Sequence, residues 1–120
     1  MIINEDLSKL KLKKKSETCE QKLRRMCKSI AEEISNDSHD GEIGGASRFM
    51  EDVYDIEWIT YRDGRYKAAS LLVAGGGPNI WVNMNTHEVE GYWASDRVIE
   101  PFIDNLGLDE YLEELHANTK

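Results

Sequence analysis

Residues 56–93 decide the fold, and they read IEWITYRDGRYKAASLLVAGGGPNIWVNMNTHEVEGYW. Four runs in this stretch are rich in the β-branched and aromatic residues typical of strands, and turn-forming residues separate them. The short connections favour an antiparallel meander, because parallel neighbours need a crossover of roughly a dozen residues or more. The predicted strands are Ile56–Tyr61, Tyr66–Ala74, Asn79–Asn83 and Glu88–Trp93.

The second predicted strand ends in the continuous apolar run Leu71–Ala74. Strands that are buried on both faces carry such runs instead of alternating polar and apolar residues. We therefore expect this strand to be central in the sheet and to be covered on both sides near its end.

A long amphipathic helix is predicted before the strands. Ser16 is a suitable N-cap, and apolar residues then recur at three- and four-residue spacing as far as about Ser35. We expect both cysteines to be core residues, because they fall on this apolar stripe. The stripe consists of Cys19, Leu23, Met26, Cys27, Ile30 and Ile34.

Shorter helices are predicted around the sheet. After a turn-rich loop at residues 36–45, Ser47 is expected to begin a helix that runs to Val53. After the last strand, Asp96 is expected to cap a short helix through Val98, Phe102 and Ile103, and Asp109 to cap a final one.

The predicted fold class is α+β. It is a four-stranded antiparallel β-meander packed with a long N-terminal helix and C-terminal helices. We expect one domain over residues 16–120, preceded by a basic flexible arm at residues 1–15.

Charge is distributed unevenly along the 120 residues. The net charge is −8, yet the first 15 residues hold five lysines against two acids, so the remainder has a net charge of −11. An acidic domain of this kind repels nucleic acid phosphate and attracts basic protein surfaces. The lysine run is either a solvated arm or a nucleic-acid binder in its own right. Its members are Lys9, Lys11, Lys13, Lys14 and Lys15.

The sequence indicates a cytoplasmic protein. It contains no apolar run of the length needed to span a membrane, and its first residues do not resemble a signal peptide. The two cysteines are too few for a disulfide framework.

No catalytic or metal site is predicted, and no cofactor is expected. The histidines, His39, His87 and His116, lack partners at metal-ligand spacing, and no nucleophile motif is present. The chain is therefore not expected to be an enzyme.

The loop Gly75–Gly77 is a structural turn, an approach site for a partner backbone, or an anion site, because glycine-rich loops can cradle phosphate. A small ligand-binding or enzymatic domain using this loop is the alternative function.

Aromatic residues concentrate on the predicted strands. Trp58, Trp81, Tyr92 and Trp93 lie there, and Tyr92 and Trp93 must point to opposite faces of the sheet. Either helices cover both faces and all four rings are core residues, or some rings form an exposed patch beside acidic residues. The second arrangement has the composition of a protein-interface hot spot.

The runs 72–83 and 89–93, followed by an acidic C-terminal helix, resemble small acidic proteins of phages and conjugative elements. The resemblance covers roughly residues 50–116 and not the lysine-rich arm. Some proteins of that kind are anti-CRISPR or anti-restriction inhibitors. The resemblance implies a non-enzymatic inhibitor or adaptor that occupies a basic nucleic-acid-binding surface of a host defence enzyme.

The predicted contact surface combines the last strand with the last helix. A meander would leave the strand Glu88–Trp93 at an edge of the sheet, where unpaired backbone groups are exposed. Its glutamates either only protect that edge or also attract a basic partner. The predicted contact residues are Glu88, Glu90, Tyr92, Asp96, Glu110, Glu113 and Glu114.

Overall fold

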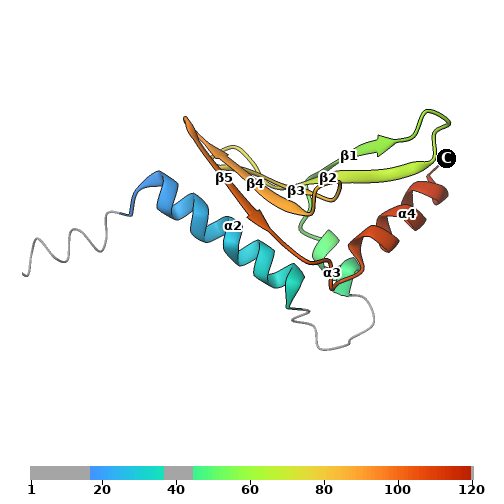
Figure 1. Ribbon diagram of the computed structural model, residues 1–120, viewed down its shortest axis with the longest axis horizontal. Coiled ribbons are helices and arrows are strands. Elements are labelled where there is room, and N and C mark those ends of the chain that lie inside the picture. The colour runs from blue at the N-terminus through green and yellow to red at the C-terminus, as the bar shows by residue number, and fades with distance from the viewer. Residues whose placement is uncertain (1–16, 37–44, 120) are drawn as a thin grey trace, which may run out of the picture.

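The computed structural model describes residues 17–36 and 45–119. The predicted arm at residues 1–15, the predicted cap Ser16, most of the predicted loop at 36–45 and His39 lie outside the described residues. The structure is α+β, as expected, with helices and a five-stranded antiparallel sheet (Figure 1).

The sheet is a meander in which each strand pairs with its neighbours in sequence, in the order β1-β2-β3-β4-β5. The strands are β1 (Asp55–Thr60), β2 (Tyr66–Ala74), β3 (Asn79–Asn83), β4 (Glu88–Trp93) and β5 (Asp96–Pro101). The helices are α2 (Cys19–Ser35), α3 (Gly45–Met50) and α4 (Leu108–Asn118).

The predicted helix after Asp96 is wrong, because this segment is strand β5. Asp96 pairs directly with Trp93 across a tight turn, in which Ala94 adopts a positive φ of 54°. Along β5, Arg97 is exposed and Val98 is buried, which is the two-residue period of a strand. Pro101 ends the strand. Proline lacks an N–H group, and an edge strand tolerates it because every second N–H group of such a strand points away from the sheet. The edges of the sheet are therefore β1 and β5, and β4 is internal.

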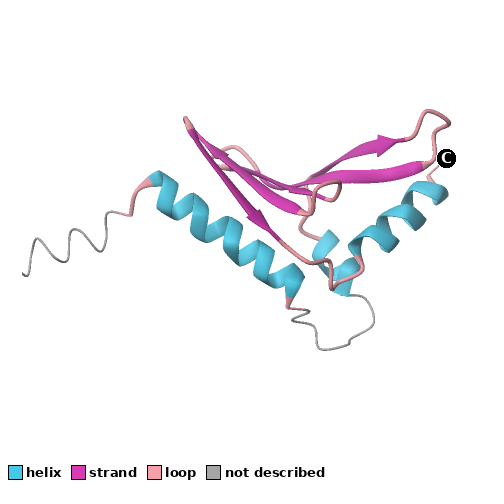
Figure 2. Ribbon diagram, in the orientation of Figure 1, coloured by secondary structure: helices cyan, strands magenta, loops and turns pink. Residues whose placement is uncertain are grey.

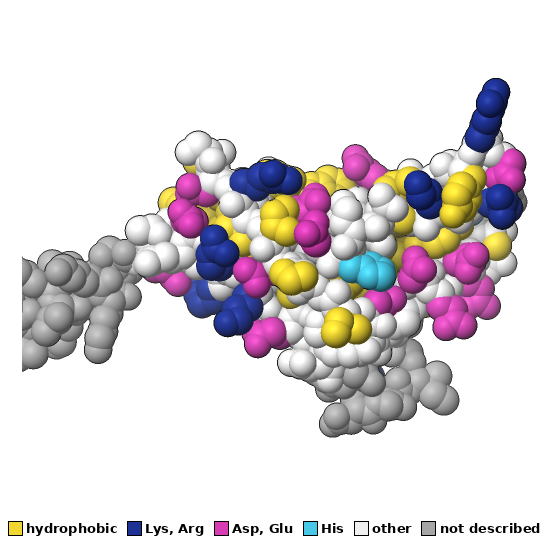
Figure 3. Space-filling view, viewed as in Figure 1, with side chains coloured by type: hydrophobic (Ala, Val, Ile, Leu, Met, Phe, Trp, Pro, Cys, Tyr) yellow, Lys and Arg dark blue, Asp and Glu magenta, His cyan; other side chains and the backbone are white. Residues whose placement is uncertain are grey.

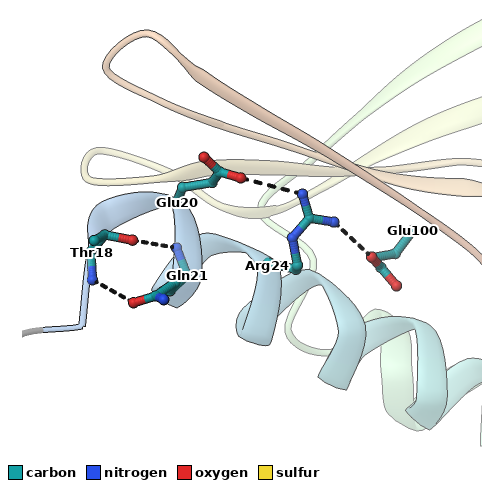
Figure 4. Close-up of polar contacts among 5 residues, drawn as sticks. All are labelled: Thr18, Glu20, Gln21, Arg24 and Glu100. Atoms are coloured by element: carbon teal, nitrogen blue, oxygen red, sulfur yellow. Dashed lines mark hydrogen bonds and ion pairs between the residues drawn. The ribbon is translucent and has the colours of Figure 1, made fainter. Parts of the chain in front are cut away.

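Helix α2 begins two residues later than predicted, because Thr18 forms a capping box that Ser16 could not form. The Thr18 Oγ1 accepts the Gln21 N–H at 3.1 Å, and the Gln21 side chain accepts the Thr18 N–H at 3.0 Å (Figure 4). This motif requires a Glu or Gln three residues after the cap, and three residues after Ser16 comes Cys19.

The two short-helix predictions also need correction. Helix α3 runs over Gly45–Met50 instead of Ser47–Val53. Asp109 does not cap α4: the N-cap position is Gly107, and the carboxylate of Asp104 accepts the N–H groups of Leu108 at 2.9 Å and Asp109 at 3.0 Å. Asp104 thereby satisfies two of the backbone donors that a helix start leaves without a partner.

The described helices lie on one side of the sheet, with α2 against β4 and β5 and α4 against β2 (Figure 2). The core lies between these layers. From the sheet it takes the fully buried Leu71, Ile80, Val82, Val89 and Val98, and from the helices Leu23, Cys27, Ile34, Leu108 and Leu112.

Helix α2 packs closely against the sheet at Gly91. A Cβ atom at this position would lie 2.5 Å from the Cys27 Sγ and 2.8 Å from the Leu23 Cδ1, so only glycine lets the helix pack this closely. Cys27 is buried as predicted, but Cys19 is exposed. The prediction for Cys19 is wrong, because this residue opens the helix and lies one turn before the first buried position, Leu23.

An ion pair fixes the same helix against the edge strand. The Arg24 guanidinium lies 3.4 Å from the Glu100 carboxylate of β5 and 3.5 Å from Glu20, one turn earlier in α2 (Figure 4). Both contacts are partly exposed, so their contribution to stability is small.

Candidate functional site

One row of paired residues crosses all five strands on the side of the sheet away from the described helices. The pairs are Asp55 with Leu72, Leu72 with Trp81, Trp81 with Glu90, and Glu90 with Ile99. Directly paired residues share a face of the sheet. Trp81 stands between Ile80 and Val82, whose buried side chains point to the helices, so the row points the other way.

We call this surface the helix-free face, meaning the face on which none of the described helices packs. A second row on it pairs Glu57 with Ser70, Ser70 with Asn83, and Asn83 with Glu88. On the other side of the first row, Tyr92 pairs with Arg97. The described helices cover β2 near its end on one side only, in contrast to the prediction: Leu72 points away from them and has Trp81 as its cross-strand neighbour.

Four large side chains of the helix-free face do not join the core, whereas Ala68, on the same face of β2, does. Leu72, Trp81, Tyr92 and Ile99 are partly buried, yet none belongs to the hydrophobic cluster or to the residues packed against it. Neighbouring side chains on one face of a sheet contact each other across strands, as the paired Leu72 and Trp81 do by register. Apolar side chains on a sheet face that no described helix covers are candidates for an interaction surface.

The other two predicted sheet aromatics point to the helices. The Trp58 ring lies 5.2 Å from the His116 ring of α4, and the Lys22 Nζ of α2 lies 5.4 Å from the Trp93 ring. The alternation of Trp93 with Tyr92 is thus confirmed. Of the two sequence-based alternatives, the one in which some rings remain uncovered by helices holds for Trp81 and Tyr92 within the described residues.

Polar contacts fix the orientation of Glu90 on this face. Its carboxylate accepts a hydrogen bond from the Asn83 Nδ2 at 3.1 Å and one from the Tyr92 hydroxyl at 3.4 Å. The Arg97 guanidinium lies 5.9 Å from the centre of the Tyr92 ring, which is within the range of a cation–π contact. These contacts hold the Glu90 carboxylate and the Tyr92 phenol in fixed orientations on the same face as Trp81.

Of the predicted contact residues, the structure brings together Glu88, Glu90 and Tyr92. Asp96 is paired with Trp93 and so lies on the helix side at the end of the β4–β5 hairpin. The remaining ones, Glu110, Glu113 and Glu114, are exposed on α4, which also packs on the helix side. The single predicted surface is therefore divided between the two faces of the domain.

Helix α4 forms an acidic surface of its own. It carries Asp109, Glu110, Glu113 and Glu114 and no lysine or arginine. In Figure 3 acidic side chains gather over α4, whereas acidic and basic side chains are mixed over α2. The Tyr66 hydroxyl of β2 donates to the Asp109 carboxylate at 2.7 Å and ties this helix to the sheet. Burial, followed by this hydrogen bond, raises the pKa of Tyr66 above its ordinary value.

The glycine loop is a turn between β2 and β3. The Asn79 Oδ1 accepts the Gly76 N–H at 3.3 Å, and Gly76 adopts a positive φ of 83°, which glycine reaches without strain. The loop leads into a strand, so it lacks the helix N-terminus that phosphate-binding loops use. These contacts support the structural role that was one of the sequence-based alternatives.

The described residues hold neither a cluster of metal-ligating side chains nor a membrane-spanning helix. No group of three His, Cys, Asp or Glu side chains there could hold a metal ion. Within the same residues, every helix is too short or too polar to cross a lipid bilayer.

Comparison of the chain with protein-family models, with curated proteins and with solved structures found no match.

Sequence reasoning missed Leu72, Trp81 and Ile99 as members of one surface. Each is apolar, and alternation alone does not say which face a helix covers. The strand register places these three residues on one face. It could not be predicted for Ile99, because residues 96–103 were expected to form a helix and not a strand paired with β4.

Proposed function

We propose that this chain is a non-enzymatic protein-binding domain that docks on a basic protein surface through the helix-free face. The observation that carries this proposal is the group Leu72, Trp81, Tyr92 and Ile99, which remains outside the core, beside Glu88 and Glu90.

The composition of this face supports a protein partner. Tryptophan and tyrosine dominate interface hot spots, because each buries a large area with few rotatable bonds. The orientation of Glu90 by Asn83 and Tyr92 reduces the entropy lost on binding.

The charge of the chain supports a basic partner. Outside the first 15 residues the net charge is −11, which steers encounters toward Lys- and Arg-rich surfaces. Glu88 makes no side-chain hydrogen bond or ion pair with the described residues, so binding need not break an existing contact of this carboxylate. Complementary charges at an interface mainly raise the association rate and exclude wrong partners.

The more specific form of the proposal concerns a nucleic-acid-processing enzyme of host defence. A groove that binds nucleic acid is lined by Lys and Arg, and an acidic domain with an aromatic centre can occupy it. In this form the chain is a cytoplasmic inhibitor of mobile-element origin, of the anti-CRISPR or anti-restriction kind, and acts by excluding nucleic acid. Its support is the charge distribution and the resemblance of residues 50–116.

Charge reversal tests the docking surface. We expect Glu88→Lys combined with Glu90→Lys to abolish capture of a partner that binds the wild-type chain, because like charges would then face each other. The matched control reverses the same number of charges on the opposite side, with Glu110→Lys and Glu113→Lys, and should retain the partner. Thermal unfolding of both variants checks that each is folded.

The salt dependence of the same complex gives a second measurement. Affinity should fall steeply between low and physiological ionic strength, since exposed charge contacts are screened over about 8–10 Å. Retained binding by the Glu88/Glu90 variant, or affinity that does not change with salt, would overturn the proposal.

A further inference from the structure

A cavity of about 140 Å³ lies on the helix side of the domain, away from the helix-free face. It opens between α2, α3 and β2, and its lining combines side chains from all three regions. The lining residues are Ile30, Glu33, Phe49, Asp52 and Val73.

The lining has an apolar part and two carboxylates. Ile30, Phe49 and Val73 supply hydrocarbon surface, and all three are buried or partly buried. Glu33 and Asp52 are exposed, and neither carboxylate makes a hydrogen bond or an ion pair with the described residues. Two carboxylates that have no partner among the described residues, beside an apolar hollow, favour a ligand that is both aliphatic and cationic.

We propose that this cavity binds the side chain of a lysine or arginine of a basic protein segment. The aliphatic stem packs on Ile30, Phe49 and Val73, and the cationic end lies between Glu33 and Asp52. Long basic side chains bury their stems and keep their charged ends in water in the same way. The site extends beyond the proposed function, because it lies on the opposite side of the sheet and needs none of the residues of the helix-free face.

Other ligand classes fit the lining less well. An anion would be repelled by both carboxylates. A bound Mg²⁺ or Ca²⁺ prefers six or more oxygen ligands, and no group of three possible ligand side chains exists among the described residues. A neutral apolar molecule would desolvate the carboxylates without compensating them.

The test is an NMR titration of the full chain with N-acetyl-lysine amide, using N-acetyl-norleucine amide as a probe that has a similar stem and no charge. We expect saturable shifts at Ile30, Phe49 and Val73 with the lysine probe, and at least about fivefold weaker binding of the norleucine probe. Equal affinity for the two probes, or no shift at these residues with lysine, would overturn the inference.

A matched pair of variants assigns the charge contacts. Glu33→Gln with Asp52→Asn should weaken binding of the lysine probe at least about fivefold. Glu32→Gln with Glu51→Gln removes the same net charge at the neighbouring positions, which do not line the cavity, and should change affinity less than about twofold. If both double variants lost the same affinity for the lysine probe, the effect would be one of overall charge, and the inference of a site would be overturned. Calcium chloride that produced the same shifts with similar affinity would identify a metal site instead and also overturn the inference.

Discussion

Trp81 of β3 pairs directly with Glu90 of β4 on the face of the sheet that the described helices leave uncovered. The tryptophan is partly buried but does not contact the core cluster, and the glutamate is held by Asn83 and Tyr92. A large apolar ring outside the core, beside an oriented carboxylate, has the composition of an interface hot spot. This pair is the centre of the proposed docking surface.

The first prediction compares the two neighbours Trp81 and Ile80. Ile80→Ala removes a fully buried core side chain and should lower the free energy of unfolding by about 2–5 kcal/mol. Trp81→Ala removes more atoms but should cost less than Ile80→Ala, because its ring lies outside the core cluster. Urea denaturation of both variants measures the difference. A larger loss for Trp81→Ala would show that the ring is a structural residue.

The second prediction concerns the close contact of α2 with β4. Gly91→Ala should lower the free energy of unfolding by about 1–3 kcal/mol, because the added methyl group would displace Cys27 and Leu23. The control is Gly77→Ala, where nothing lies within 4 Å of the added atom and no positive φ must be kept. Its stability should stay within about 0.5 kcal/mol of the wild type. Equal effects in urea denaturation would contradict the described packing.

The third prediction distinguishes the two cysteines. Cys19 is exposed and should react with a thiol reagent in the native protein, whereas Cys27 is buried and should react only after unfolding. Burial, followed by the charge of Glu100, raises the pKa of Cys27 to about 11, which further suppresses its thiolate. Titration with Ellman's reagent should count one thiol in the native chain and two in guanidinium chloride. Rapid release of two in the native chain would contradict the burial of Cys27.

The same thiol makes stability depend on pH in the alkaline range. Because the folded state raises this pKa above the ordinary value of 9.0 to about 11, the unfolded chain loses its thiol proton first. The contribution of Cys27 is therefore complete below pH 9 and falls as the pH rises toward 11. The unfolding free energy of a Cys27→Ala variant should decline less over this interval than that of the wild type.

The fourth prediction concerns the attachment of α4. Tyr66→Phe removes the hydroxyl that donates to Asp109 and should lower the free energy of unfolding by about 1 kcal/mol. Tyr61 is exposed, and no hydrogen bond of its hydroxyl with the described residues is present, so Tyr61→Phe should be close to neutral. A matching change in both variants would show that the Tyr66–Asp109 bond adds nothing.

The strands β2, β3 and β4 were predicted from the sequence with the bounds that the structure shows. Alternation and turn residues suffice there, because Asp63-Gly64 and Gly75–Gly77 mark the ends of the strands unambiguously. Strand β5 was not predicted: Asp96 reads as a helix cap, and the partner that makes it a strand, Trp93, lies across a turn with no glycine. In this segment, pairing with β4 outweighs the local preference for a helix. Because β5 was not predicted, β4 was wrongly expected to be an edge strand.

Only part of the candidate site could be predicted from the sequence, because the rest depends on tertiary packing. The sequence indicates that Tyr92 and Trp93 take opposite faces, but the face that the helices cover depends on packing, in which Gly91 admits α2. Sequence order suggested that Glu88 and Glu113 share a surface. In the structure α4 packs under β2, on the other side of the sheet from Glu88, so proximity in sequence did not become proximity in space.

The most direct measurement of the docking surface is site-specific photo-crosslinking. A benzophenone amino acid replaces Trp81 in one variant and Glu113 in another, and each is irradiated in complex with a partner that binds the wild-type chain. We expect a discrete adduct from position 81, whose side chain belongs to the helix-free face, and none from position 113 on α4. An adduct from position 113 that equals or exceeds the one from position 81 would contradict the proposal that the helix-free face is the contact surface.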